Sequence, residues 1–473
     1  MGLAECEITP PEGFPMAGYY HERLAEGTID PLKARAVVFR DGDQSAALVV
    51  CDLIGIATDL SREVRRQASA NTGIPAEHII LSATHSHTAP DYMKELWLVL
   101  GDSAEEKSQQ QPARAAYIQS LINNLTAVIA EADRTSAPVL LQYGTATQAT
   151  PVSFNRRFVM RDGSVRTWQN LKNPEVVRAA GPIDPTIGLL KISDTQSHVR
   201  GVISNFALHL DTVGGSRWSA DYPFFIERTL QGTLGPDVIS VFGTGCCGDI
   251  NHVNPAAAER NTAAVIGTAL GDTIVSQLDQ LQTLPASGFR VKTETVLLPL
   301  QEATADQVRQ SIAVLDRAKQ HEKVDFFEHV TAYKKLILDQ MRHASPAATT
   351  SQHITWGLSR SLAGVGDALP VDVTVMTFGS ELAIVCLPGE VFVELGLAIK
   401  QASPFRQTMV IELSNAVETI YVPHRAAYAG GSYEVTNSAL QPGGGEVLVE
   451  TALRLLRENA TVTQQAGSPA GLK

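Results

Sequence analysis

The chain has little of what marks several common classes of protein. Residues 1–15 contain Glu5, Glu7 and Glu12, and we do not expect the basic start and apolar stretch of a signal peptide there. Because the chain also has an odd number of cysteines, five in 473 residues, no disulfide framework is expected. Basic residues number 38 against 50 acidic ones, and the net charge of -12 excludes a nucleic-acid partner. No apolar run reaches the roughly 18 residues of a membrane-spanning helix. We therefore expect a soluble, cytoplasmic protein without an integral membrane segment.

The composition, with 44% hydrophobic and 19% charged residues, is that of an ordinary globular protein. Apolar β-rich runs alternate with helical segments, which predicts a mixed α/β fold of β-sheets flanked by helices. We expect one domain over residues 1–458 and a flexible tail over residues 459–473, which are rich in Thr, Gln, Gly, Ser and Pro. The expected elements are strands at 34–40 and 46–51 around an Asp-Gly-Asp turn, strands at 201–208, 371–378, 382–387 and 409–413, a helix capped by Thr304 and Gln307, and a charged helical pair within 311–343.

Two histidines one residue apart follow an apolar run that ends near Leu81. His85 and His87 lie in Ala-Thr-His-Ser-His-Thr, residues 83–88. An extended chain directs alternate side chains to the same side, so both imidazoles can face one point at a strand end. Imidazole is the commonest metal ligand in proteins, and such a position suits a catalytic zinc ion. Taken alone, the motif is equally compatible with one core histidine and one solvated histidine.

Polar side chains that can bind a metal also follow other strand-like runs. They are His209, Asp249, Glu390 and Tyr421. Because active sites of layered α/β proteins collect at strand ends, one composite site is predicted there. Cys247, in the pair Cys246-Cys247, is expected to be structural unless the fold places it at this site.

Several ordered segments carry a resemblance to a known family. They are residues 83–88, Asn205-Phe206-Ala207-Leu208-His209 followed by Ser219-Ala220-Asp221, Pro388-Gly389-Glu390, and Tyr421 with Tyr428 and Tyr433-Glu434 downstream. The chain resembles the neutral or alkaline, non-lysosomal ceramidases, which are zinc amidases, from Ala4 to about Arg457. The resemblance implies the fold of their catalytic domain, with His85, His209, Glu390 and Tyr421 as zinc ligands. It also implies that Arg156, in Asn155-Arg156, faces the substrate, although a surface salt bridge is an equal alternative for this arginine.

The implied ligands make chemical sense together. Two imidazoles, a carboxylate and a phenol oxygen suit zinc, which activates water and polarises a carbonyl group. In an extended chain His87 cannot easily share the metal with His85. We therefore expect His87 to act on the substrate oxyanion or in proton transfer.

The chain departs from the family at its proposed nucleophile. Ceramidases carry Gly-Asp-Val-Ser-Pro-Asn, whereas this chain has Gly248-Asp249-Ile250-Asn251-His252, so Asn251 stands in place of the serine. An amide is not a nucleophile, and we expect metal-activated water to attack directly. Asn251 and His87 would then hold the substrate or oxyanion, and Asp249 or His252 would move protons. Cys247 as a replacement nucleophile is the less favoured alternative.

A second departure concerns the substrate. Ceramide-hydrolysing members are commonly secreted or membrane-facing and carry an additional C-terminal β-sandwich domain, which we do not expect here. The expected function is zinc-dependent hydrolysis of an amide, or of an ester or lactone, in a small soluble substrate, and a homo-oligomeric state stays open. A metal-dependent lyase or isomerase acting on a hydroxylated small molecule, and a non-catalytic binding protein on the same scaffold, are the alternative functions.

Overall fold

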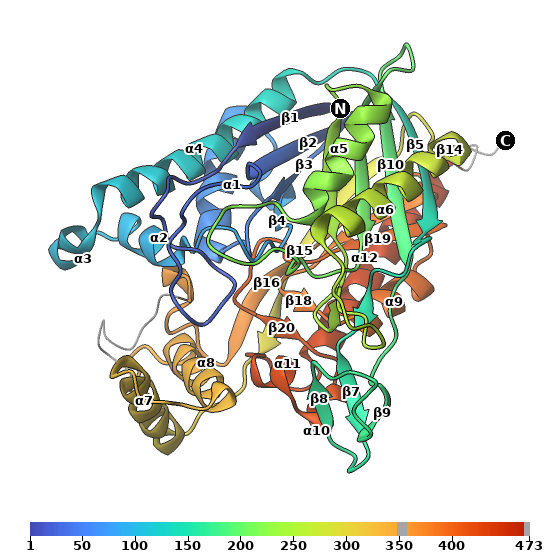
Figure 1. Ribbon diagram of the computed structural model, residues 1–473. Helices are drawn as coiled ribbons and strands as arrows, with labels where there is room; N and C mark the ends of the chain where they lie inside the picture. Colours follow the sequence, from blue (N-terminus) through green and yellow to red (C-terminus); the bar gives the residue numbers. More distant parts are fainter. Residues whose placement is uncertain (348–356, 468–473) are drawn as a thin grey trace.

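The computed structural model describes residues 1–347 and 357–467, with side chains as far as residue 461. Three larger sheets carry helices on their outer faces (Figure 1). The first sheet has the order β1 (Gly2–Glu7), β2 (Lys33–Asp41), β3 (Gln44–Cys51), β4 (Ile79–Ala83), and helices α1 (Thr58–Thr72) and α4 (Pro112–Arg134) cover it.

The other two larger sheets have the same general plan. The second has the order β12 (Ile239–Thr244), β11 (Val199–Phe206), β10 (Thr186–Ser193), β5 (Leu140–Thr147), β14 (Gln282–Thr283), with α5 (Tyr222–Leu234) and α6 (Ala263–Gln277) outside it. The third has the order β15 (Phe289–Pro299), β16 (Ala368–Phe378), β17 (Leu382–Cys386), β19 (Gln407–Ile411), with α9 (Val393–Ala402) and α12 (Gly444–Gly467) outside it. The predicted mixed α/β fold is confirmed.

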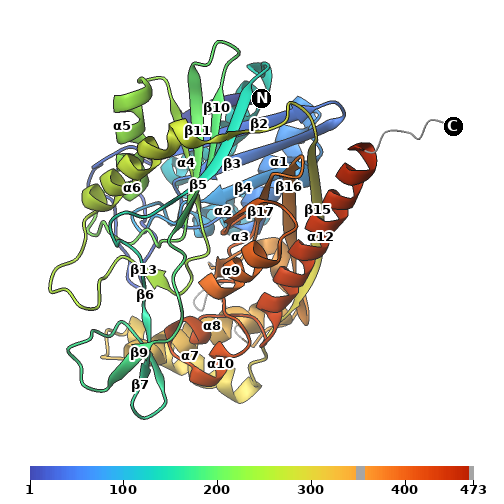
Figure 2. The same cartoon turned by 90° about the vertical axis from the view of Figure 1, so that its right-hand side faces the viewer.

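Smaller elements surround one end of these sheets (Figure 2). The short sheets are β13 (Ile250–Asn251) with β6 (Phe154–Asn155), β18 (Glu390–Val391) with β20 (Tyr421–Val422), and β8 (Val165–Thr167), β7 (Arg157–Met160) and β9 (Val176–Ala179). The remaining helices are α2 (Met93–Val99), α3 (Ala104–Gln109), α7 (Ala305–Lys319), α8 (Phe326–Arg342), α10 (Ala427–Gly430) and α11 (Tyr433–Thr436), with single 3-10 turns at Ala76–His78, Leu278–Gln280 and Arg360–Leu362.

The inner faces of the three larger sheets share one apolar core. In β2, Val37 and Phe39 point into this central core, whereas the alternate residues Ala36 and Val38 pack in the outer core that contains buried residues of α1 and α4. The period-two alternation of a strand therefore divides each strand between two cores. Ile203 of β11 and Ile384 of β17 complete the central core from the other two sheets.

The carboxyl ends of three strands meet at one place. Each larger sheet contains a parallel pair, β3 with β4, β11 with β12, and β17 with β19. Backbone hydrogen bonds then join the sheets, because the Ala83 N–H donates to the Leu413 carbonyl over 3.1 Å and the Glu412 N–H to the Thr244 carbonyl over 2.9 Å. The loops that follow these strands are thereby held beside one another, as a composite site requires.

Local predictions of turns and helix starts from the sequence are confirmed. The β2–β3 hairpin turns at Asp41–Gln44, and Thr304 and Gln307 form a capping box at the start of α7. The domain boundary expected at residue 458 stays a prediction, and α12 continues from Gly444 to Gly467 across it. Asn459 is buried in this helix and donates a 3.3 Å hydrogen bond to Thr377, and this contact stabilises the helix beyond residue 458. Residues 468–473 lie outside the described part of the chain.

None of the described helices combines the length and the apolar character that crossing a bilayer requires.

A buried charge network supports the end of the first sheet. Arg35 lies between the carboxylates of Asp52 and Glu227, at 3.0 and 2.5 Å. Asp52 in turn accepts a 3.3 Å hydrogen bond from the Thr84 hydroxyl, next to His85. The guanidinium therefore bridges two buried acids, one of which also pairs with Lys33, and supports the loop that carries the histidines.

Removing the guanidinium should leave the buried Asp52 carboxylate without its cationic partner, whereas Glu227 keeps its ion pair with Lys33 over 2.7 Å. We expect Arg35→Ala to lower the free energy of unfolding by about 3–5 kcal/mol. Urea unfolding followed by circular dichroism measures the effect. The control is Arg66→Ala, whose side chain is 67% exposed in its ion pair with Glu63, and its unfolding midpoint should stay close to that of the parent protein. Equal midpoints for the two variants would contradict a structural role for Arg35.

Candidate metal centre

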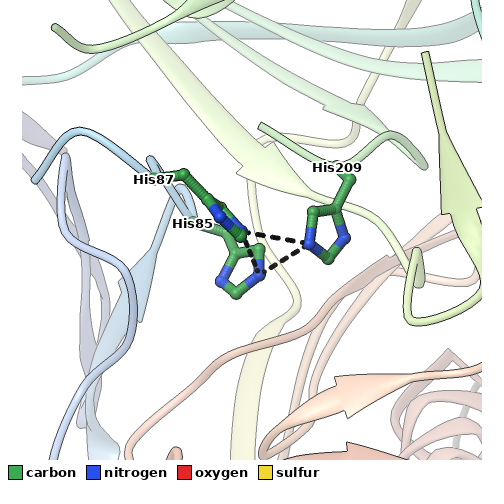
Figure 3. Close-up of side chains that lie close together, drawn as sticks. All are labelled: His85, His87 and His209. Carbon is green, nitrogen blue, oxygen red and sulfur yellow. Dashed lines mark hydrogen bonds between the residues drawn. The ribbon is translucent and has the colours of Figure 1, made fainter. Parts of the chain in front are cut away.

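Three histidines bring one ring nitrogen each to a common point (Figure 3). The Nε2 atoms of His85 and His209 are 3.1 Å apart, those of His87 and His209 3.2 Å, and those of His85 and His87 3.4 Å. A tetrahedral zinc ion with bonds of about 2.0–2.1 Å separates neighbouring ligand atoms by roughly 3.3–3.4 Å. The three nitrogens therefore have the spacing of ligands on one metal ion.

The participation of His87 differs from the expectation that it faces the substrate. That expectation assumed an extended chain through His85 and His87. The strand β4 instead ends at Ala83, and His85 has a φ of 78° in the left-handed region. This backbone turn changes the direction of the chain between the two histidines, so that both Nε2 atoms reach the same point.

Backbone carbonyls determine the tautomers of two of the rings. The His85 Nδ1–H donates to the Ile54 carbonyl over 2.6 Å, and the His87 Nδ1–H donates to the Gly18 carbonyl over 3.1 Å. A ring that donates from Nδ1 has a free lone pair on Nε2 when it is neutral. Two acceptor nitrogens thus face each other 3.4 Å apart, an arrangement that a cation between them stabilises.

His209 is held from the opposite side. Its Nδ1 lies 3.7 Å from the Cys247 sulfur, and that thiol donates to Glu412 over 3.0 Å. Asp221 accepts backbone hydrogen bonds from Thr212 and Val213, which secures the loop after His209. Burial raises the pKa of the Cys247 thiol well above its usual value, and Glu412 acts in the same direction. The thiol therefore stays protonated at neutral pH, which argues against a nucleophilic role.

Glu390 and Tyr421 lie beside the three histidines. The Glu390 Oε2 atom is 3.3 Å from the His85 Nε2 and 3.9 Å from the His209 Nε2. It is buried and no described residue donates a hydrogen bond to it, as expected of a carboxylate oxygen that binds a metal. Tyr421 is the direct partner of Glu390 in the β18–β20 pair, and its hydroxyl lowers the pKa of that carboxyl. The donor set of three imidazoles and one carboxylate fits zinc.

The protonation states also suit metal binding. Burial lowers the pKa of His87 to about 4 and that of His209 well below its usual value, so both rings are neutral at pH 7. Burial alone would raise the pKa of Glu390, but His85 and Arg156 lower it more strongly, and the carboxyl is ionised. Neutral imidazoles and an ionised carboxylate are the ligand forms that a divalent metal requires.

Arg156 is buried in contact with this group. Its Nη2 donates to the Tyr421 hydroxyl over 2.9 Å and to the Gly248 carbonyl over 2.8 Å, and its Nε donates to Glu434 over 2.8 Å. The structure therefore places this arginine inside the molecule rather than in a surface salt bridge. Asp249 supports it indirectly, since the Arg156 N–H donates to the Asp249 carbonyl.

The described contacts of Asp249 and Asn251 are structural. Both oxygens of the Asp249 carboxylate accept hydrogen bonds, from Asn155 and from the Val393 N–H. Asn251 lies in β13, where its Oδ1 accepts from the Val253 N–H over 3.1 Å. None of these hydrogen bonds reaches the histidines. His252, the next residue in the sequence, is also buried, but it is not one of the three histidines whose ring nitrogens lie together.

Sequence reasoning missed the groups that hold the ligands. The carbonyls of Gly18 and Ile54 carry no side-chain signal, and only the fold brings them to the histidines. Glu412 did carry a signal, because it is an acidic residue inside the apolar run 409–413. A fully buried carboxylate at such a position indicates a partner of some kind.

Comparison with known proteins gives a family match for part of the chain and a shared fold for nearly all of it. Residues 1–216 match the model of the neutral/alkaline non-lysosomal ceramidase N-terminal region. The chain is similar to the crystal structure of neutral ceramidase from Pseudomonas aeruginosa, with a TM-score of 0.70 and 18% identity over 98% of this chain and 74% of that one. A ceramidase complexed with C2 gives a TM-score of 0.69 and 16% identity, over 98% of this chain and 75% of that one. A search of curated proteins found no match. The predicted resemblance and the predicted fold are confirmed.

The hydrogen bond from His87 to Gly18 can be tested with a matched pair of glycines. Gly18 has a φ of 100°, and an added Cβ would lie 2.7 Å from the His87 carbonyl oxygen. We expect Gly18→Ala to displace the carbonyl that orients His87 and to weaken zinc binding by about 10-fold to 100-fold. Zinc titration against a chromophoric chelator measures this.

The control is Gly13→Ala. Gly13 also has a positive φ, of 78°, but its added Cβ would meet nothing within 4 Å. It carries the same backbone strain without touching a histidine, so its zinc affinity should stay near that of the parent. Equal loss in both variants would assign the effect to strain alone.

Proposed function

We propose that this protein is a metal-dependent hydrolase, because residues 1–216 match the neutral/alkaline non-lysosomal ceramidase model and the chain has the fold of the ceramidase structures. The family and the fold suggest an amide hydrolase, and the proposal adds zinc dependence and a small substrate. Esters and lactones are secondary substrates, since they too present a carbonyl group.

The observation that supports this proposal is the approach of the three Nε2 atoms beside the unpartnered Glu390 oxygen. We assign His85, His87, His209 and Glu390 as the residues that hold the zinc ion. Tyr421, next to Glu390, is assigned to the edge of the site, where its hydroxyl is oriented by Arg156. His87 thus joins the ligands, and the substrate role first considered for it passes to Tyr421 and Asn251.

A zinc ion at this position supplies Lewis acidity that activates water and polarises a carbonyl. The protein residues orient the substrate around it. The Asn251 Oδ1 is occupied by the Val253 N–H, and no described residue accepts a hydrogen bond from its Nδ2. The Asn251 amide is therefore oriented to donate from Nδ2, and we assign it to the developing oxyanion. Asp249 is assigned as a positioning residue, because its carboxylate accepts a hydrogen bond from Asn155, the residue before Arg156.

The first test concerns the metal and the reaction together. Zinc-loaded protein should hydrolyse members of a panel of small amides, lose this activity on treatment with a chelator and regain it with zinc. Oxygen-18 from labelled water should appear in the carboxylate product, because hydrolysis incorporates solvent oxygen.

His85→Ala, His87→Ala and His209→Ala should each retain less than about a tenth of the bound zinc, as removal of a ligand predicts. Metal analysis of the purified variants measures this.

His252→Ala is the control for loss of a buried histidine and should retain its zinc. Full zinc occupancy in His87→Ala would show that His87 is not a zinc ligand and would favour the alternative that it contacts the substrate. A product without the solvent label would contradict hydrolysis and favour lyase or isomerase chemistry.

The second test concerns Asn251. Its replacement by alanine should lower kcat by roughly 10²-fold to 10³-fold, the usual cost of losing one oxyanion donor, and should leave zinc content unchanged. Asn254→Ala is a matched control, because the Asn254 Oδ1 likewise accepts from the N–H two residues later, over 2.9 Å. Mass spectrometry of rapidly quenched enzyme should detect no acyl adduct. An adduct on Cys247 would refute direct attack by water.

A further inference from the structure

A group of aromatic rings connects the surface with the candidate metal centre. Tyr433 lies in the middle, with its ring centre 5.7 Å from that of Tyr421, 4.7 Å from that of Trp168 and 6.0 Å from that of Phe326. Tyr20 extends the group, at 5.7 Å from Phe326. We call Tyr20, Trp168, Phe326 and Tyr433 the aromatic cluster.

The cluster is assembled from distant segments. Phe326 begins α8, Tyr433 begins α11, and Trp168 follows β8. Figures 1 and 2 show α8 and the β7–β8–β9 sheet at the same end of the molecule, and Figure 1 shows α11 between them. Together with Tyr20, these residues come from four separate segments, and a surface made in this way beside one site is a common arrangement for substrate binding.

Two rings of the cluster remain open to solvent. Trp168 is 49% exposed and Phe326 43% exposed, whereas Tyr421 at the inner end is only 5% exposed. Large aromatic rings left in water beside a site indicate a binding surface, because their apolar faces gain free energy when a ligand covers them. The exposure therefore increases outward along a line of contacting rings that starts at the metal centre.

Trp168 is also held in a costly conformation by the site itself. Its φ of 58° lies in the left-handed region, which is unfavourable for a tryptophan. The Trp168 N–H donates to the Arg156 carbonyl over 2.9 Å, so the backbone of the buried arginine holds this ring in place. Such strain at an exposed aromatic residue is more readily explained by ligand binding than by packing.

We propose that the aromatic cluster binds a flat aromatic group of the substrate, next to the bond that is cleaved. This inference rests on the proposed function and names its substrate class, which is amides that carry an aromatic ring within a few bonds of the carbonyl. Ring-to-ring contact adds about 0.5–1.5 kcal/mol beyond area burial, so flat rings should be preferred over saturated groups of equal size.

The experiment measures binding without turnover. Isothermal titration calorimetry of the zinc-loaded protein compares 3-phenylpropionate, 3-cyclohexylpropionate and propionate, which share a carboxylate and differ in the ring. We expect 3-phenylpropionate to bind about 3-fold to 10-fold tighter than 3-cyclohexylpropionate, as the ring contact predicts. The difference in affinity between 3-phenylpropionate and propionate should be larger still. Equal or tighter binding of the saturated ring would overturn the proposal.

Variants assign the effect to the cluster. Trp168→Ala and Phe326→Ala should each weaken 3-phenylpropionate about 3-fold to 10-fold and leave propionate unchanged, whereas Trp168→Phe should retain most of the affinity. Leu171→Ala is the control, since Leu171 is 54% exposed on the same segment. Loss of propionate binding as well would indicate a general structural defect and overturn the assignment.

Kinetics distinguish this inference from the proposed function. Among amides that are hydrolysed, Trp168→Ala should raise KM for N-benzoylglycine and leave that for N-acetylglycine unchanged. If no amide or ester is hydrolysed while 3-phenylpropionate still binds through Trp168, the proposed function fails and the aromatic subsite stands. If amides are hydrolysed without any preference for aromatic groups, the subsite is wrong and the hydrolase stands.

Discussion

Three imidazole nitrogens approach one another within 3.4 Å in the interior of this protein, and the surrounding structure is arranged to hold them there. Neutral rings that donate from Nδ1 present lone pairs from Nε2, and lone pairs repel. The carbonyls of Ile54 and Gly18 nevertheless hold two of the rings in this tautomer. A cation placed between these nitrogens would bind their lone pairs, so the three histidines form a candidate metal centre.

The fold supplies the rigidity that this approach requires. His85, His209 and Glu390 follow strands of three different sheets, and no single sheet could bring them together. Hydrogen bonds between the strand ends, and a core shared by all three sheets, hold those loops in register. The Arg35 network adds support behind the loop of His85, through Asp52 and Thr84. Metal sites require ligand positions accurate to a few tenths of an ångström, and loops closed on several rigid elements meet that requirement.

The sequence predicts this arrangement unevenly, for physical reasons. Apolar alternation and turn chemistry are local, so the β2–β3 hairpin and the capped helix α7 are predicted correctly. His85, His209, Glu390 and Tyr421 lie close together, and their role as metal ligands stays a prediction. The participation of His87 depends on one backbone dihedral angle at His85, which periodicity does not encode. The aromatic cluster joins residues separated by more than a hundred positions, and the helix through Asn459 depends on packing against Thr377, so neither follows from local pattern.

The chemistry of Cys247 and Asn251 restricts the proposed reaction to attack by water. Cys247 is buried, hydrogen-bonded to Glu412 and protonated, and Asn251 carries an amide that is not a nucleophile. Without a covalent step, the reaction depends on how accurately the substrate carbonyl is placed between the metal and its oxyanion donor. Binding free energy from parts of the substrate remote from the reacting bond can supply that placement. In the proposed mechanism the aromatic cluster has this role, because Tyr433 contacts Tyr421 directly and the rings of Trp168 and Phe326 are partly exposed to solvent.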